Sequence, residues 1–353
     1  MAEIKVLLLD DEPLVVEGIR DLIELETEYS VYSAVSPQLA LNMLTETQVQ
    51  VILTDFLMPK MNGIDFLISA KKMVPNAACI MLTGYADKEN AIKAINDVGL
   101  YHYVEKPWDN DELLMIVRNA AERSDLISEL QRKYAEIQQA YVGTIYRLAT
   151  VAEIFDENTF SHVLRISLLC HKLAELSGED ETFCNEIKYA SMMHDVGKVG
   201  IPKGILTKNG KLTQDEFDVV KKHAEIGAHI LRNPENQMLK MAREMSLCHH
   251  EKWNGQGYPN NLKGNDIPKS ARIAAIADVF DALMSARPYK PPFSPEKVRS
   301  ILEEERDRHF DPDLLDIFLK EFKSVLDIYY HVSSLRDDDI MNVLFTSPKG
   351  SQE

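Results

Sequence analysis

The sequence predicts two domains joined by a long helix. The first is an α/β domain with a doubly wound, five-stranded parallel sheet, and the second is an all-α domain. Three observations support this division. The chain has 353 residues, which is too many for one compact core and suits two domains. Short apolar runs alternate with amphipathic stretches in the first third of the chain. Beyond residue 150 the pattern becomes helical.

Each apolar run in the first third has the length of a buried strand. These runs cover residues 4–9, 31–34, 49–54, 78–82 and 101–104. Amphipathic stretches, which predict helices, lie between and after them, near residues 14–26, 37–45, 64–73, 87–98 and 109–121. Strands that alternate with helices form a parallel sheet covered on both faces. Ligands of such sheets bind at the carboxyl ends of the strands.

Polar residues follow the predicted strands where that rule expects a site. Asp10 and Asp11 come directly after the first strand, and Asp55 follows the third. Thr83 follows the fourth strand and Lys106 the fifth. Three carboxylates at one edge repel each other, which favours a hard divalent cation such as Mg²⁺. The magnesium ion would neutralise them and also receive a phosphoryl group.

Four motifs in this part of the chain resemble the receiver domain of two-component systems. They are DDEP at 10–13, TDFLMPKMNG at 54–63, LTG at 82–84 and KP at 106–107, within a match that covers about residues 1–122. The resemblance implies a flavodoxin-like fold, with Asp55 as the phospho-acceptor and a sensor histidine kinase as the phosphoryl donor. It also implies that Asp10, Asp11 and Asp55 hold Mg²⁺. Thr83 and Lys106 would contact the phosphoryl group.

Tyr103 lies three residues before Lys106, at the position of an aromatic switch residue in that family. Simple packing of a strand residue explains it equally well, and the sequence leaves both interpretations open. Phosphorylation would add nearly two negative charges at Asp55, which reorders neighbouring loops and helix faces in such switches. Whether this raises or lowers the output is also left open.

Apolar residues after the receiver-like segment predict a helical connector over residues 123–146. The seam alternates steps of three and four, as in a coiled coil, at Ile127, Leu130, Tyr134, Ile137, Tyr141, Thr144, Leu148 and Val151. Val117, Ala120 and Ser124 follow the same rhythm upstream, with one skip between Ile127 and Leu130. A parallel homodimer that carries a signal between the domains is favoured. The alternative is a single amphipathic helix packed on the second domain.

Histidines gather in the second domain, which is predicted over residues 147–332. They occur with two aspartates: His162, the pair His194 and Asp195, His223, the pair His249 and His250, and Asp278. One histidine on a helix is most often structural, whereas five histidines with two aspartates favour a metal site. Histidine with carboxylate suits Fe, Mn, Ni or Zn better than Ca²⁺.

Three motifs in this region resemble the HD-GYP family, a branch of the HD phosphohydrolases. They are HDVGK at 194–198, HHEKWNGQGYP at 249–259 and RPYK at 287–290, within a match over about residues 147–330. The resemblance implies a binuclear site with two divalent metals, Fe or Mn foremost and Ni or Zn as alternatives. The first metal would be held by His162, His194, Asp195 and Asp278, and the second by His223, His249 and His250, with Asp195 bridging both.

The position four residues before the first of these histidines argues against a third metal. Some members of that family carry a glutamate there, which helps to hold another ion. Here the residue is Asn158, and a neutral amide is a poor ligand for a third cation. Glu157 is adjacent but points about 100° away on a helix. Two metals are therefore predicted.

The same resemblance implies hydrolysis of a cyclic dinucleotide. By this resemblance, two metals would lower the pKa of a water molecule, and the resulting hydroxide would attack phosphorus in line with the departing 3′ oxygen. In this scheme Asp195 bridges the two metals, and Lys198 contacts a phosphate or the leaving oxygen. The alternative for Lys198 is a solvated lysine on a helix surface. Asp281 shares a helical face with Asp278 and is expected to support a ligand rather than to bind metal.

Three further residues are expected to contact the substrate. Arg287 and Lys290 supply cations for its phosphates in an otherwise acidic chain. Tyr258 stacks on a guanine or fixes its own loop, and the sequence does not distinguish these roles. The predicted protein is thus a response regulator whose phosphorylation at Asp55 controls metal-dependent hydrolysis of cyclic di-GMP to pGpG, and onward to GMP. The alternatives are another cyclic dinucleotide, such as a mixed GMP–AMP ring, and a non-catalytic adaptor that acts through protein contacts.

Composition and charge argue against other classes of function. The net charge of −17 opposes DNA binding, and no helix-turn-helix or basic recognition helix follows the connector. No run of 18 apolar residues predicts a membrane span, and the acidic N-terminus does not resemble a signal peptide. The four cysteines show no metal or disulfide spacing, as expected for a cytoplasmic protein. Residues 333–353 are polar and expected to fray.

Overall fold

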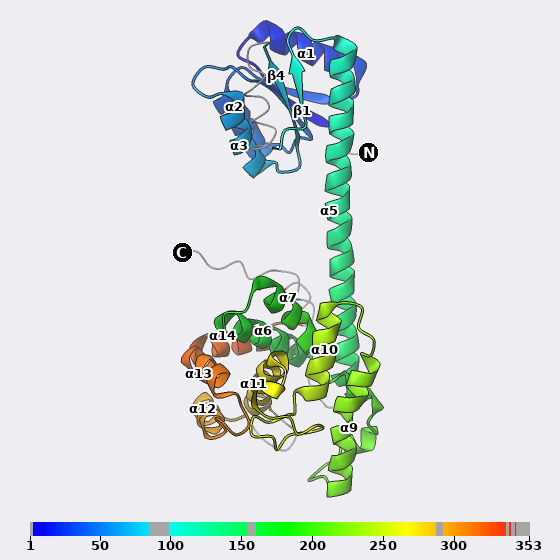
Figure 1. The fold of residues 1–353 in the computed structure, drawn as a ribbon, viewed down its shortest axis with the longest axis vertical. Helices are drawn as coiled ribbons and strands as arrows, with labels where there is room; N and C mark the ends of the chain where they lie inside the picture. The colour runs from blue at the N-terminus through cyan, green and yellow to red at the C-terminus, as the bar shows by residue number, and fades with distance from the viewer. Residues whose placement is uncertain are drawn as a thin grey trace. The chain divides into compact units, whose positions relative to one another are not determined.

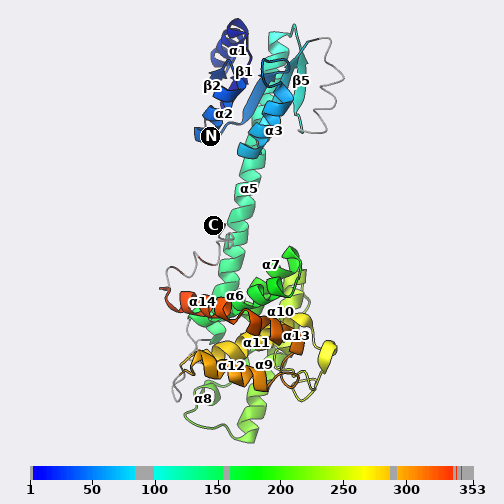
Figure 2. The ribbon, with the colours of Figure 1, turned by 90° about the vertical axis from the view of Figure 1, so that its left-hand side faces the viewer.

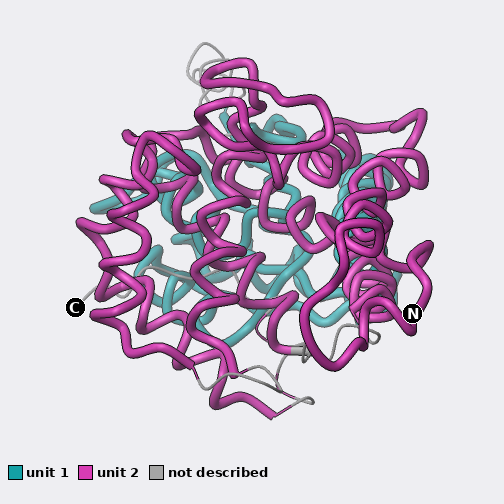
Figure 3. Tube along the Cα trace, turned by 90° about the horizontal axis from the view of Figure 1, so that it is seen from below, with its two compact units in different colours: residues 1–137 teal, residues 138–353 magenta. Residues whose placement is uncertain are grey.

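The computed structural model describes residues 3–84, 99–153, 160–286 and 292–336, together with residues 339 and 343 (Figures 1 and 2). The chain divides into two compact units, residues 1–137 and residues 138–353, coloured teal and magenta in Figure 3. The helix predicted near residues 87–98 lies outside the described residues. Within the described segments, no helix has both the length and the apolar character that a membrane span requires.

Unit 1 contains the predicted five-stranded sheet. Its strands are β1 (Lys5–Leu9), β2 (Ser30–Ala34), β3 (Val51–Asp55), β4 (Ala78–Thr83) and β5 (His102–Glu105). Their order is β2-β1-β3-β4-β5, and every neighbouring pair is parallel, which confirms the predicted fold class. The apolar runs are continuous because the sheet is covered on both faces, and Leu7, Leu8 and Leu9 are completely buried.

Helices cover the two faces of this sheet (Figure 1). The described helices of this part are α1 (Pro13–Glu26), α2 (Pro37–Glu46), α3 (Gly63–Met73) and α5 (Asn110–Glu153). α1 and the first turns of α5 form one core with the sheet, to which α5 contributes Leu113 and Val117. α2 and α3 form the core on the opposite face, through residues such as Leu44 and Phe66. The strand ends between these layers are therefore held by two separate hydrophobic cores.

α5 is one helix of 44 residues that begins in unit 1 and ends in unit 2. Val117 and Ala120, two upstream positions of the predicted seam, are completely buried in the core of unit 1. They therefore do not face a partner helix, which corrects the upstream extension of the seam. Downstream, Leu130, Tyr134 and Ile137 are 70%, 64% and 63% exposed. Leu148 and Val151, further along the seam, are 59% and 50% exposed, so the described seam is open to a partner from Leu130 onward but not upstream.

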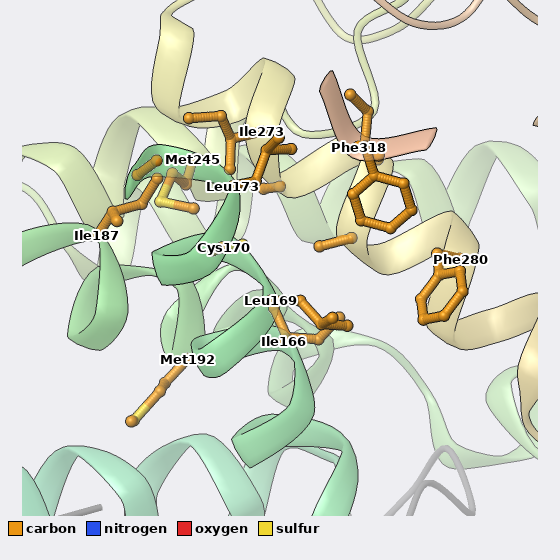
Figure 4. Packing of buried hydrophobic residues seen from close by; sticks show 14 of the residues in the cluster. Ile166, Leu169, Cys170, Leu173, Ile187, Met192, Met245, Ile273, Phe280 and Phe318 are labelled. Carbon is orange, nitrogen blue, oxygen red and sulfur yellow. The ribbon is translucent and has the colours of Figure 1, made fainter. Parts of the chain in front are cut away.

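The described part of unit 2 after α5 is helical, as predicted. Its elements are α6 (Phe160–Leu176), α7 (Glu181–Ala190), η2 (Ser191–Met193), η3 (Val196–Gly200), α8 (Lys203–Leu206), α9 (Gln214–Ile230), α10 (Gln237–Cys248), η4 (Gly264–Asp266), α11 (Lys269–Met284), α12 (Pro295–Glu304), α13 (Pro312–Lys320) and α14 (Phe322–Ser333). Figure 4 shows part of the shared core, to which α6 contributes Leu169, α7 Ile187, α10 Met245, and α11 Ile273 and Phe280. This core positions α6, which carries His162, and α10, which directly precedes His249 and His250.

Candidate active site

The predicted receiver residues meet at the carboxyl end of the sheet. Asp10, Asp11 and Asp55 each offer a carboxylate oxygen within 4.8 Å of the others. Lys106 Nζ lies 2.9 Å from Asp10 Oδ2 and 2.8 Å from Asp55 Oδ1. Burial raises the pKa of Asp55, an effect that Lys106 opposes without cancelling it. This cluster of oxygens fits a hard divalent cation such as Mg²⁺.

Thr83 and Tyr103 lie on the neighbouring strands β4 and β5. Thr83 is 2% exposed, and its hydroxyl donates a hydrogen bond to the carbonyl of Gly84. Tyr103 is half-buried and packs against the core on the α2 and α3 face of the sheet. This intermediate exposure is compatible with both interpretations of Tyr103, strand packing and an aromatic switch.

The histidines of unit 2 come from separate elements that converge on one buried centre. His162 lies on α6, His223 on α9 and Asp278 on α11. His194 and Asp195 directly follow η2, and His249 and His250 directly follow α10. A capping box at Thr213 and Glu216 begins α9 and so sets the position of His223 along that helix. Tertiary packing therefore assembles the centre from segments that are far apart in the chain.

Four of the histidines have their ring orientation fixed through Nδ1. His162 Nδ1 lies 2.7 Å from Asp281 Oδ2. The other three rings point Nδ1 at backbone carbonyls: His194 at Ser191, His223 at Val220 and His249 at Met245, at 2.8, 2.7 and 3.0 Å. Because these oxygens only accept, Nδ1 carries a proton in each ring, which leaves Nε2 as the atom that can bind a metal.

The corresponding Nε2 atoms are the strongest evidence for a metal centre. All four are buried, and none makes a hydrogen bond within the described part of the chain. A buried acceptor without a hydrogen bond is costly, so several of them facing one another require an explanation. Divalent metal ions fit, because imidazole Nε2 atoms whose Nδ1 donates to an oxygen are common metal ligands.

The ligand atoms form two groups, each with members within 4.8 Å of one another. One group consists of Asp195, His223, His249 and His250, and the other of Glu153, His162 and His194. Asp195 lies between them, because its Oδ1 is 3.2 Å from His223 Nε2 and its Oδ2 is 3.3 Å from His194 Nε2. Asp278 belongs to neither group, although its Oδ1 lies 4.0 Å from His194 Nε2.

The electrostatics of Asp195, His249 and His250 favour the forms that bind metals. Burial opposes the charge of Asp195, but Lys198 and His194 outweigh it and hold the pKa of this carboxyl well below its ordinary value. Burial lowers the pKa of His249, and burial with neighbouring histidines holds that of His250 well below its ordinary value. An ionised carboxylate and neutral imidazoles are the states that coordinate a metal.

His194 and His162 favour the protonated form instead. Burial opposes a charge on His194, but Asp195 outweighs it and raises the pKa of this histidine to about 9. In the same way, Asp281 outweighs burial and raises the pKa of His162. A metal at these two rings would therefore displace a proton when it binds.

Lys198 lies inside this centre. It is 9% exposed, on the short 3₁₀ helix η3, and its Nζ lies 2.7 Å from Asp195 Oδ2 and 3.4 Å from Glu153 Oε2. The alternative of a solvated helix lysine is therefore wrong. Both contacts are with residues of the metal groups, so the ammonium is held beside the candidate metal ligands.

Two residues of the centre were not predicted from the sequence. Glu153 is the last residue of α5 and no motif marks it. Arg165 lies one turn after His162 on α6, and both its Nε and its Nη2 donate to the carboxylate of Asp281, the latter at 2.9 Å. Asp281 therefore contacts a histidine and an arginine, as its predicted supporting role requires. In the sequence, only the helical spacing of Arg165 from His162 could have indicated that Arg165 belongs to this centre.

The loop after the double histidine has a narrowly defined backbone. A Cβ on Gly257 would lie 2.3 Å from the backbone nitrogen of Lys252, so a larger residue cannot occupy this position without a shift. The carboxylate of Glu251 accepts hydrogen bonds from the backbone nitrogens of Asn260 and Leu262, at 2.7 and 3.0 Å. These contacts hold the loop that carries Tyr258.

Tyr258 contacts a candidate metal ligand directly. Its ring stacks on His250, with centroids 4.7 Å apart and an interplanar angle of 29°. The ammonium of Lys221 lies 5.8 Å from the Tyr258 centroid, and the ring of Phe217 lies at 6.4 Å. Packing against His250 supports the loop-fixing alternative. The other predicted substrate contacts, Arg287 and Lys290, lie outside the described residues, as do Asn158 and Glu157.

Two protein families match the chain. The response regulator receiver domain matches residues 6–118, and the HD domain matches residues 117–314. The second match alone covers more than half of the chain, and the two meet within α5.

Several curated proteins are similar to this chain, and the first two described here match it over both regions. A cyclic di-GMP phosphodiesterase of Thermotoga maritima is 31% identical over 342 residues, which covers 92% of each chain. The cyclic di-GMP phosphodiesterase response regulator RpfG of Xanthomonas campestris is 33% identical and covers 90% of this chain and 87% of its own. A 3′3′-cGAMP-specific phosphodiesterase 2 of Vibrio cholerae is 41% identical over 220 residues, 57% of this chain and 42% of its own.

Proposed function

This chain belongs to the response regulators that join a receiver domain to an HD domain, and from this premise we propose that it is a metal-dependent cyclic di-GMP phosphodiesterase. The observation that carries the proposal is the set of buried Nε2 atoms of His162, His194, His223 and His249. They belong to two groups of candidate ligands, and Asp195 lies close to His194 of one group and His223 of the other. The full-length relatives named above are cyclic di-GMP phosphodiesterases, which supports the substrate.

In the proposed mechanism, residues of both groups hold two divalent metals. His162, His194, Asp195 and Asp278 would hold one metal, and His223, His249, His250 and Asp195 the other. When bound, such metals supply a nucleophilic water at neutral pH and positive charge beside the phosphoryl oxygens. Lys198, which Asp195 positions, donates a proton or a hydrogen bond to the departing 3′ oxygen. Tyr258 keeps His250 oriented by stacking on its ring.

A turnover assay with two substrates tests the activity. We expect the purified protein with Mn²⁺ or Fe²⁺ to convert cyclic di-GMP to pGpG, and onward to GMP, and we expect a chelator to stop the reaction. Chromatography of the products identifies them, and a mixed GMP–AMP ring serves as the second substrate because a 3′3′-cGAMP-specific relative is also similar. Turnover of the mixed ring alone would contradict the substrate, and turnover of neither ring by metal-loaded protein would contradict the activity.

We also propose that phosphorylation of Asp55 by a sensor histidine kinase controls this hydrolysis. Asp10 and Asp11 would hold Mg²⁺ with Asp55, and Lys106 would pair with the phosphoryl group. In the described structure Lys106 pairs with the Asp55 carboxylate instead. A phosphoryl group there adds charge and oxygen acceptors, so this ion pair must rearrange.

A parallel homodimer through the downstream part of α5 is the proposed assembly. Leu130, Tyr134 and Ile137 are spaced by four and three residues and are mostly exposed. We expect light scattering to report the mass of two chains, and Leu130→Glu with Ile137→Glu to reduce it to one, because charges oppose burial of the seam. Glu136→Gln, an exposed change on the same helix, should leave the mass unchanged. A wild-type mass of one chain would contradict the dimer.

A further inference from the structure

The last residue of α5 lies inside the metal centre. α5 begins at Asn110 and packs against the receiver sheet through Leu113 and Val117. It ends at Glu153, which is 3% exposed. One unbroken helix therefore has its first turns in the receiver core and its last side chain among candidate metal ligands.

The carboxylate of Glu153 has the surroundings of a metal ligand. It offers an oxygen within 4.8 Å of a ring nitrogen of His162 and of His194. Its Oε2 lies 3.4 Å from Lys198 Nζ, and the same ammonium lies 2.7 Å from Asp195. Two buried carboxylates thus share one ammonium beside two imidazoles. Burying that much negative charge is costly, and a divalent cation next to the imidazole nitrogens offsets it.

We propose that Glu153 is a ligand of the metal that His162 and His194 hold, and that α5 thereby transmits the state of the receiver to the metal centre. This inference rests on the proposed metal-dependent function. Glu153 joins the first of the two metals, so the expected number of metals stays at two. His162 and His194 belong to α6 and to the segment after η2, so a shift of α5 relative to these elements would change the distance between the carboxylate and the two imidazoles. Ligand distances at such metals vary by only about 0.2 Å, so a small shift changes the affinity.

Metal binding without substrate tests the ligand assignment. The full-length protein, Glu153→Gln and the exposed control Glu136→Gln are titrated with Mn²⁺ by calorimetry in excess Mg²⁺, which occupies the receiver site, and bound Mn²⁺ is counted by mass spectrometry. We expect two equivalents for the wild type and the control, and at least about a tenfold weaker affinity for one of the two equivalents in Glu153→Gln. Two equivalents bound with wild-type affinity by Glu153→Gln would overturn the assignment and leave Glu153 as a positioning residue for Lys198.

Two further variants separate these roles and guard against misfolding. Glu153→Asp keeps the charge, and we expect it to retain both equivalents with an affinity for the first metal between those of the wild type and Glu153→Gln. Lys198→Met removes the ion pair but no proposed ligand, so it should keep both equivalents. If Glu153→Gln is unfolded by circular dichroism, Glu153→Asp decides alone: wild-type affinity at both sites would overturn the assignment.

Beryllofluoride, a phosphoryl mimic for the receiver, tests the transmission. At constant Mg²⁺, we expect it to change the Mn²⁺ affinity of the wild type several-fold, and to have no effect in Asp55→Asn or Glu153→Gln. An unchanged affinity in a wild type whose hydrolysis rate does respond would overturn the route through Glu153. If the metal affinity responds but no cyclic dinucleotide is hydrolysed, the proposed function fails and this inference stands.

Discussion

Asp195→Asn is expected to lower cyclic di-GMP hydrolysis by roughly a thousandfold or more. Asp195 is the side chain that lies between the two ligand groups, with Oδ1 near His223 and His249 and Oδ2 near His194. An amide presents only one oxygen and carries no charge, so it cannot serve both metals. Steady-state kinetics at saturating Mn²⁺ measures the loss, and the metal content should fall with it. The exposed change Asp316→Asn is the control and should retain full activity.

A double variant at His194 and Asp195 distinguishes the phosphodiesterase from a non-catalytic signalling adaptor. The double variant His194→Ala/Asp195→Ala removes ligands from both groups and leaves the surface of the chain unchanged, because both residues are buried. For the phosphodiesterase, we expect all cellular output that depends on this protein to disappear with the activity. Output that persists in the folded double variant would favour the adaptor.

Asp281→Ala is expected to destabilise unit 2 by about 3–5 kcal/mol, because it leaves a buried guanidinium without its carboxylate. Arg165 is 5% exposed, and Asp281 accepts hydrogen bonds from its Nε and Nη2. For a unit of this size the loss corresponds to roughly 10 °C in melting temperature. Urea denaturation of the full chain, followed by circular dichroism, measures it. The metal affinity should also fall, by about 10- to 100-fold, because His162 loses the acceptor at its Nδ1.

A double variant provides the matched comparison. Asp281→Leu with Arg165→Met removes both charges and fills similar volume, so we expect it to be more stable than Asp281→Ala alone. The metal affinity should stay low in the double variant, because the acceptor for His162 is still missing. If the free energy of unfolding of Asp281→Ala were within about 1 kcal/mol of the wild-type value, a stabilising role for this ion pair would be contradicted.

The strands of unit 1 were predictable because the sheet is buried on both faces. Such strands consist of short continuous apolar runs, and the residue after each run lies at the functional edge. Asp10, Asp55 and Lys106 could therefore be assigned to one site before any coordinates were known. The connector was less predictable. Val117 and Ile137 share the same periodic pattern, yet the first is buried against the sheet and the second is exposed.

The sequence by itself determined the two fold classes, the receiver site and the candidate metal ligands, because these depend on local periodicity and on short motifs such as HDVGK. Tertiary structure alone decided that Glu153 lies beside His162 and His194, and that Asp281 binds His162 and Arg165. His162 and Asp281 are 119 residues apart in the chain. Their contact follows from how α6 and α11 pack, and a pattern that repeats every three or four residues contains no information about such packing.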